Sequence, residues 1–153
     1  MAADAWEELL ALLDRRALTA AEAEEALVGR GIARTRARAA VAKARRFGLI
    51  DDRRVAADIA ERGGQGSHGV LRVQHDLERR RVPETLAADA LRAVDDLARC
   101  KEALAAYLAR HPHPQDRRGA ARLANFLGRR GFTEESVREA LTEFGIDPGW
   151  HDA

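Results

Sequence analysis

The hydrophobic positions of the chain recur at an interval of fifty residues. Leucine stands at positions 27, 77 and 127, and an apolar residue follows five positions later at Ile32, Val82 and Phe132. Downstream, each segment continues with apolar residues at spacings of three, four and seven, which predicts an amphipathic helix. The matching sets are Ala37, Ala87 and Val137, then Ala40, Ala90 and Ala140, then Val41, Leu91 and Leu141, then Ala44, Val94 and Phe144. A repeated helix of this kind needs a neighbouring helix to cover its apolar face.

Turn and capping residues divide the chain into nine predicted helices. Gly31 and Gly131 suit the left-handed conformation that ends a helix. Thr19 and Glu22 have the spacing of a capping box. No segment alternates with period two, so we expect no sheet. The predicted helices span about residues 4–16, 19–30, 33–47, 51–62, 68–80, 83–96, 98–110, 116–130 and 133–144.

These elements predict an all-α fold of three tandem three-helix repeats that form an elongated, curved array. The predicted repeats cover residues 1–48, 49–97 and 98–145, and residues 146–153 form a C-terminal tail. The segments GGQGS at 63–67 and HPHPQ at 111–115 are the main predicted breaks within repeats.

Composition favours a helix-rich protein outside the membrane. Hydrophobic residues make up 46% of the chain and charged residues 33%. No apolar run approaches the roughly 18 residues that a membrane span needs, and the first residues lack the basic segment of a secretory signal. We therefore expect a cytoplasmic protein.

The sequence offers no set of residues typical of an enzyme. The single cysteine, Cys100, can form no internal disulfide and no thiolate metal cage. No phosphate-binding loop, serine nucleophile motif or Cys/His pair is present. We expect no catalytic residue, no cofactor and no metal.

The net charge is only +1, but the charges are unevenly distributed. Residues 1–28 hold seven acids against two arginines, whereas residues 29–54 hold nine basic residues against two acids. An acidic beginning is therefore followed by a basic segment.

Two segments of the chain resemble the RecX family of regulators of the RecA recombinase: GLIDDRRVAADIAER at 48–62 and GVLRVQHDLERRRV at 69–82. The residues that carry the resemblance are Gly48, Leu49, Ile50, Asp51, Asp52, Ala56, Gly69, Arg72, Val73, Leu77, Arg80, Arg81 and Val82. The resemblance covers nearly the full chain and implies three tandem three-helix repeats with the RecA filament as partner.

The chain departs from the family pattern at three positions. Val55 replaces an aromatic residue, Val70 replaces a proline, and Arg81 replaces the glycine of the middle turn. If position 81 keeps a positive φ, Arg81 carries modest backbone strain. A structural role for the Asp51–Asp52 pair can be argued independently of the family resemblance. Asp51 can cap the following helix, and Asp52 adds favourable charge near the helix N-terminus.

Polar residues at helical spacing form a stripe on the predicted helix 116–130. Its members are Arg118, Arg122, Asn125 and Arg129. Fifty residues earlier the same positions hold His68, Arg72, His75 and Arg79. In the first repeat they hold Leu18, Glu22, Glu25 and Gly29, so two acids interrupt the pattern. The outward stripe therefore changes sign between the first repeat and the other two.

We predict that these stripes, with one flank of the helix 33–47, face a negatively charged partner, because arginine pairs with carboxylates and phosphates alike. The simpler interpretation is that the arginines stay solvated over alanine-rich helices. The candidate partner-binding residues are Arg34, Arg38, Arg45, Arg72, Arg79, Arg118, Arg122 and Arg129.

The leading hypothesis is a monomeric regulator that binds the RecA filament and inhibits its growth and its recombinase and ATPase activity, with single- or double-stranded DNA as a further partner. One alternative is an autonomous nucleic-acid-binding helical-repeat protein that uses the same arginines on phosphates. Such a protein binds DNA alone, with log affinity falling by about 0.7 to 0.9 per neutralised phosphate per log unit of salt. A third hypothesis is a general protein-interaction scaffold.

Overall fold

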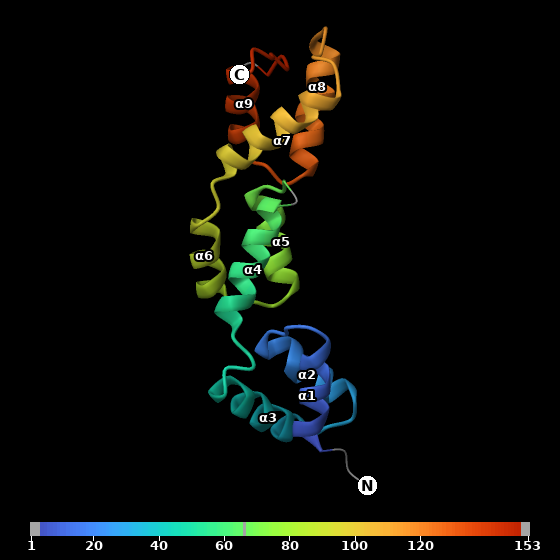
Figure 1. Ribbon diagram of the computed structural model, residues 1–153, viewed down its shortest axis with the longest axis vertical. Helices are drawn as coiled ribbons and strands as arrows, with labels where there is room; N and C mark the ends of the chain where they lie inside the picture. Colours follow the sequence, from blue (N-terminus) through green and yellow to red (C-terminus); the bar gives the residue numbers. More distant parts are fainter. Residues whose placement is uncertain (1–3, 66, 151–153) are drawn as a thin grey trace. The chain divides into compact units, whose positions relative to one another are not determined.

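The structure is a computed structural model that describes residues 4–65 and 67–150. Within these ranges the chain forms nine α-helices and no strand, so the predicted all-α fold is confirmed (Figure 1). The helices are α1 (Ala5–Arg15), α2 (Ala20–Gly29), α3 (Arg34–Arg46), α4 (Asp52–Gln65), α5 (Val70–Arg79), α6 (Glu84–Arg92), α7 (Asp96–Arg110), α8 (Arg117–Arg129) and α9 (Glu134–Glu143). Their pairwise contacts are consistent with three three-helix units. None of these helices has the length and apolar character needed to cross a bilayer.

Two helix ends differ from the sequence prediction by three residues or more. Helix α4 continues to Gln65, beyond the predicted end near residue 62. Glycine lowers helix stability by only about 1 kcal/mol and keeps its backbone N–H, so two glycines in a last turn do not stop the helix. Helix α6 ends at Arg92 and not near residue 96. The reason is Asp95, whose side chain caps α7 by accepting from the Ala98 N–H at 3.0 Å while its own backbone is extended.

The leucine that recurs every fifty residues closes the same turn in each repeat. The carbonyls of residues 27, 77 and 127 accept from the N–H groups of residues 32, 82 and 132 at 3.1, 3.1 and 3.4 Å. Positions 31, 81 and 131 between them have φ values of 89°, 58° and 89°. This is a Schellman motif, in which an apolar residue after the turn accompanies an apolar residue in the last helical turn. Arg81 therefore does occupy the left-handed region, the condition under which modest backbone strain is expected.

The chain divides into two compact units. The first unit contains Met1–Asp58 and Leu77–Ala90, and the second contains Ile59–Asp76 and Leu91–Ala153. Helices α1, α2 and α3 pack on one another in the first unit, and α7, α8 and α9 pack on one another in the second. The residues of α4, α5 and α6 are divided between the two units. The repeat boundaries at 48/49 and 97/98 stay a prediction.

Each unit has its own apolar core. Leu9 and Leu27 are fully buried in the first, and Leu104, Leu127 and Leu141 are fully buried in the second.

The third helix of the middle repeat, α6, is less buried than its two equivalents, α3 and α9. Helices α3 and α9 each bury several apolar residues, whereas α6 has no buried residue, although its sequence keeps the same apolar spacing.

A set of hydrogen bonds links α2 to the start of α4 and to the α5–α6 turn within the first unit. We call this set the first joint. The Asp52 carboxylate accepts from the Ala20 N–H at 2.8 Å. The buried Thr19 hydroxyl donates to the Arg80 carbonyl at 2.9 Å. The Arg80 guanidinium donates to the Glu22 carboxylate at 2.9 to 3.2 Å. The first joint consists of residues 19, 20, 22, 52, 80 and 81.

The second joint repeats this arrangement between α5, α7 and the α8–α9 turn, within the second unit. Asp96 accepts from the Val70 N–H at 2.7 Å and from the N–H and hydroxyl of Thr133, each at 3.0 Å. The Gly69 N–H donates to the Arg130 carbonyl at 2.9 Å. The second joint consists of residues 69, 70, 72, 96, 130, 131 and 133. In both joints an aspartate at the start of one helix binds the first N–H of another helix.

Candidate interaction surface

The stripe predicted on α8 lies on its exposed face. Asp116 caps the helix by accepting from the Gly119 N–H at 2.8 Å. Ala120, Leu123, Ala124 and Leu127 are buried on the core side of the helix. Arg118, Arg122, Asn125 and Arg129 are all exposed. Within the described part of the chain, none of the three arginines has an ion-pair partner. The α8 stripe therefore presents three positive charges that the protein itself does not neutralise.

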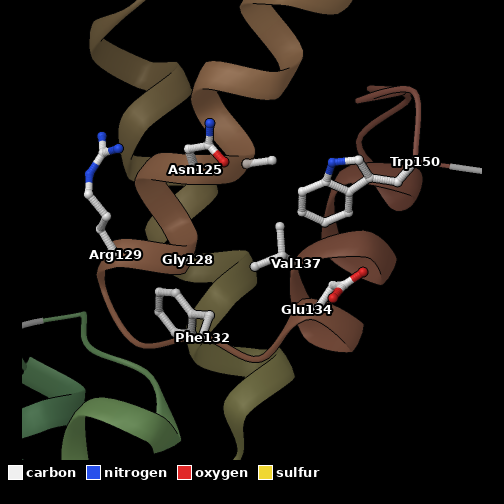
Figure 2. A pocket seen from close by; sticks show the side chains of 8 residues that line it. Asn125, Gly128, Arg129, Phe132, Glu134, Val137 and Trp150 are labelled. Atoms are coloured by element: carbon white, nitrogen blue, oxygen red, sulfur yellow. The ribbon is translucent and has the colours of Figure 1, made fainter.

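A hollow of about 600 Å³ lies beside the α8 stripe and between α8, α9 and the residues that follow α9. Phe132 and Val137 form its apolar part, and the Arg129 guanidinium and the Trp150 indole stand at opposite rims (Figure 2). Asn125 also lines it, so two members of the stripe border a surface that can accept an apolar group.

The predicted stripe on α5 is less regular. Arg72, His75 and Arg79 are exposed, but His68 precedes the helix, which begins at Val70. Arg72 lies 3.4 Å from Asp76, a surface pair of small energy. Arg79 belongs to the first unit and Arg72 to the second.

His68 precedes the second joint, and two arginines of that joint act on its imidazole. Partial burial lowers the pKa of the His68 imidazole below 6.5, and the positive charges of Arg72 and Arg130 lower this pKa further. Asp76 acts in the opposite direction without cancelling the effect.

Two of the three candidate arginines on α3, Arg34 and Arg38, are paired with acids of α2. Arg34 donates to Glu24 at 3.0 Å and to Glu25 at 2.9 Å. Arg38 donates to Glu24 at 2.8 Å. These hydrogen bonds from Arg38 and Arg34 lower the pKa of the Glu24 carboxyl, and the Glu25 contact raises the pKa of Arg34. Of the two acids that interrupt the stripe in the first repeat, Glu25 pairs with Arg34 on α3, whereas Glu22 pairs with Arg80.

The sequence analysis did not identify the contacts that Asp52 and Asp96 make at the joints. Asp51 caps α4 as predicted, accepting from the N–H groups of Arg53 and Arg54 at 3.1 and 3.2 Å. Asp52 does more than add charge, because it binds the N-terminus of α2. Its counterpart Asp96 lies 44 residues further on and not fifty, so the interval that reveals the other equivalent positions hides this pair.

Cys100 is fully buried, and this burial together with the charge of Asp96 raises the pKa of its thiol to about 12. The thiol is therefore inert as a nucleophile near neutral pH. Among the described residues, no group of three or more His, Cys, Asp or Glu side chains is placed to hold a metal ion.

Comparison with known proteins finds curated relatives that are described as regulatory protein RecX. No protein-family model matches the chain. The regulatory protein RecX of Trichlorobacter lovleyi is 32% identical over 142 residues, which cover 89% of this chain and 92% of the relative. The regulatory protein RecX of Chlorobaculum tepidum is 30% identical over 141 residues, covering 90% of this chain and 86% of the relative.

Two solved structures have the same fold. The crystal structure of RecX from Lactobacillus salivarius superposes with a TM-score of 0.81 at 18% identity, covering 92% of this chain and 94% of that one. A second crystal structure of a regulatory protein RecX gives a TM-score of 0.76 at 20% identity, covering 91% of this chain and 71% of that one. With helices, turns and near full-length relatives in agreement, the chain belongs to the RecX family of regulatory proteins, which are not enzymes.

Proposed function

We propose that the chain binds the RecA nucleoprotein filament and inhibits its growth and its DNA-dependent ATPase activity. Membership of the RecX family implies regulation of RecA. The observation that best supports direct binding is the α8 stripe, because Arg118, Arg122 and Arg129 are exposed and have no ion-pair partner among the described residues. Guanidinium groups in this state are available to the carboxylates and phosphates of a nucleoprotein filament.

The proposed mechanism is steric and competitive. The side chains of Arg72 and Arg79 on α5 are also exposed, so both α5 and α8 carry cations to the surface. Several weak contacts made by one chain reinforce one another through effective concentration, since each bound contact holds the next one near its target. A chain held on the filament in this way occupies surface that an incoming RecA protomer needs.

A titration of the chain into a DNA-dependent RecA ATPase assay tests the proposal, alongside binding of the chain to naked single-stranded DNA. We expect inhibition at concentrations well below those needed to bind DNA alone. Binding to naked DNA at lower concentrations, with the salt dependence of phosphate neutralisation, would instead favour an autonomous nucleic-acid-binding protein.

Charge reversal assigns the effect to the predicted surface. The variant with Arg72, Arg79, Arg122 and Arg129 replaced by Glu is compared with one in which Arg15, Arg46, Arg54 and Arg110, also exposed, are replaced by Glu. Both variants change the net charge equally, so a difference between them reports on position. We expect the first variant to lose at least about tenfold in filament affinity. Equal binding by the folded first variant and the parent chain would refute the proposed surface.

A further inference from the structure

A second hollow lies in the first unit, beside the first joint. Its volume is about 430 Å³, and it is bordered by α2, α3, the start of α4 and the α5–α6 turn. Val41, Ala42 and Pro83 supply apolar surface, and the guanidinium-bearing residues at its edge are Arg38, Arg45 and Arg81. Glu24 and Asp52 are its acidic members.

Some of the charged groups around this hollow are bound within the chain, and others are not. Arg38 is held by Glu24 at 2.8 Å, and Asp52 is occupied by the Ala20 N–H at 2.8 Å. Arg81 has only a distant contact to Glu25, at 4.0 Å, and its side chain is 57% exposed. In the part of the chain that the structure describes, Arg45 is exposed and makes no ion pair. Two guanidinium groups thus remain available for a ligand.

Arg81 occupies a backbone position that suits glycine. Its φ is 58°, whereas the equivalent positions of the other repeats are Gly31 and Gly131, both with φ of 89°. A side chain in the left-handed region destabilises the turn, and strained residues of this kind concentrate at ligand-binding sites. The Schellman turn needs nothing from the guanidinium, because its hydrogen bonds are made by the backbone. The Arg81 side chain therefore has no structural role in the turn that offsets its strain.

We infer that this hollow binds a carboxylate side chain of a protein partner, with Arg45 and Arg81 holding the carboxylate and the apolar surface of Val41, Ala42 and Pro83 receiving the aliphatic part. The inference rests on the proposed function, since the partner to be tested is the RecA filament. It adds a specific contact in the first unit, separate from the α8 stripe.

The composition of the hollow favours a carboxylate over a nucleic-acid strand. A DNA backbone brings a continuous series of phosphates, and Glu24 and Asp52 repel such a series. A single acidic side chain places its charge at the two available arginines and its methylene groups on the apolar surface. The bidentate geometry of guanidinium and carboxylate adds specificity to this pairing.

The substitutions Arg81→Gly and Arg45→Ala test the inference in the full chain, with Arg46→Ala as the matched control. Arg46 is an exposed arginine on the same helix as Arg45 but does not line the hollow. Each variant is measured for binding to RecA filaments on single-stranded DNA, for binding to that DNA alone, and for thermal unfolding. We expect Arg81→Gly and Arg45→Ala each to weaken filament binding by about three- to tenfold and to leave DNA binding unchanged.

Thermal unfolding separates a binding role of Arg81 from a structural one. Because glycine adopts positive φ freely, Arg81→Gly is expected to keep or raise the Tm while binding falls. Undiminished filament binding by both variants, or an equal loss in Arg46→Ala, would overturn the inference. A parallel loss in binding to DNA alone would overturn the choice of a carboxylate and indicate phosphate. A parent chain that does not bind filaments would contradict the proposed function itself, a result distinct from these.

Discussion

The two joints share one hydrogen-bond scheme but differ in the charge of two equivalent side chains. In the first joint Glu22 and Arg80 form an ion pair, with Nη2 of Arg80 2.9 Å from the carboxylate. Fifty residues on, the equivalent positions of the second joint hold Arg72 and Arg130, two cations. An aspartate that accepts from the first N–H of another helix is common to both joints, whereas the charges at these two neighbouring positions differ.

The joints also differ in how closely the backbones approach. A Cβ atom on Gly69 would lie 2.4 Å from the Gly131 carbonyl oxygen and 2.5 Å from the Phe132 Cα. A Cβ atom on Gly131 would lie 2.5 Å from the Arg72 backbone nitrogen. The equivalent residues of the first joint are Thr19 and Arg81, which both carry side chains. The second joint thus requires glycine, whereas in the first joint the Thr19 side chain itself supplies a hydrogen bond.

The largest effect is expected from Gly69→Ala. The added methyl group meets backbone atoms, which cannot turn away as a flexible side chain can. We expect a loss of about 3 kcal/mol in the free energy of unfolding, measured by urea denaturation. At the first joint, Thr19→Ala removes a cap and the hydrogen bond to Arg80 and should cost about 1 kcal/mol.

Gly29→Ala is the control for Gly69→Ala. Gly29 is helical, and nothing lies within 4 Å of the position of an added Cβ. We expect this substitution to stabilise the chain by about 0.5 to 1 kcal/mol. A cost for Gly69→Ala no larger than that of Thr19→Ala would show that the two joints are equally tolerant and would contradict the comparison.

The next largest effect on stability is expected from replacing the aspartates of the two joints, Asp52 and Asp96. Asp96 accepts hydrogen bonds from three donors, whereas Asp52 is bound by one, the Ala20 N–H. We expect Asp96→Ala to lower the free energy of unfolding by about 2 kcal/mol and Asp52→Ala by about 1 kcal/mol, because each leaves partly buried donors unpaired. Asp14→Ala, at an exposed acid on α1, should have almost no effect in the same urea titration. Equal losses at Asp52 and Asp96 would show that the extra donors contribute nothing.

The sequence predicts the parts of this fold that depend on local rules. The helix-ending turns at Gly31 and Gly131, the Thr19–Glu22 capping box and the Asp51 cap follow from residue type and spacing, and the structure contains all of them. Contacts between distant segments follow from no local rule. The pairing of Asp52 with Ala20 depends on how one repeat packs on the next, which the amphipathic pattern does not specify.

The candidate interaction surface is also only partly predictable from the sequence. The stripe on α8 is predictable because it lies on one helix, whose periodicity fixes the exposed face. The neutralisation of Arg34 and Arg38 by Glu24 is not, because it requires the packing of α3 against α2. Sequence can therefore identify where arginines lie on a helix, and only the packing shows which of them remain available.

Glu22 in the first joint and His68, which precedes the second joint, should affect stability in different pH ranges. Burial alone would raise the pKa of Glu22, but hydrogen bonds from Arg80 and the Thr19 N–H, with the charges of Arg80 and Arg16, lower this pKa below 4.5. The stabilisation from Glu22 is therefore complete above pH 4.5 and is lost as the pH falls below that value. The lowered pKa of His68 means that acidification below pH 6.5 already protonates the unfolded chain in preference to the folded one.

Urea unfolding at a series of pH values tests this separation. Glu22→Gln should remove part of the stability loss below pH 4.5 and leave the range between 4.5 and 6.5 unchanged. His68→Gln should do the reverse. Because both side chains are partly solvated, each effect should stay below about 1 kcal/mol. A Glu22→Gln variant that follows the parent chain at every pH would show that the pair with Arg80 does not contribute to the first joint.

The smallest expected effect is a change in binding to RecA filaments. It tests whether ion pairing within the chain distinguishes Arg34 and Arg38 on α3 from the arginines on α8. Glu24→Gln with Glu25→Gln removes the carboxylates that hold Arg34 and Arg38 and leaves the α2 backbone unchanged. The freed guanidinium groups should tighten binding to RecA filaments by about two- to fivefold, the range expected for surface ion pairs. The control is Glu102→Gln with Glu135→Gln, two exposed acids on α7 and α9 whose removal changes the net charge equally. An equal gain from the control pair would mean that overall charge and not the release of Arg34 and Arg38 governs binding, and the distinction between paired and available arginines would lose its functional meaning.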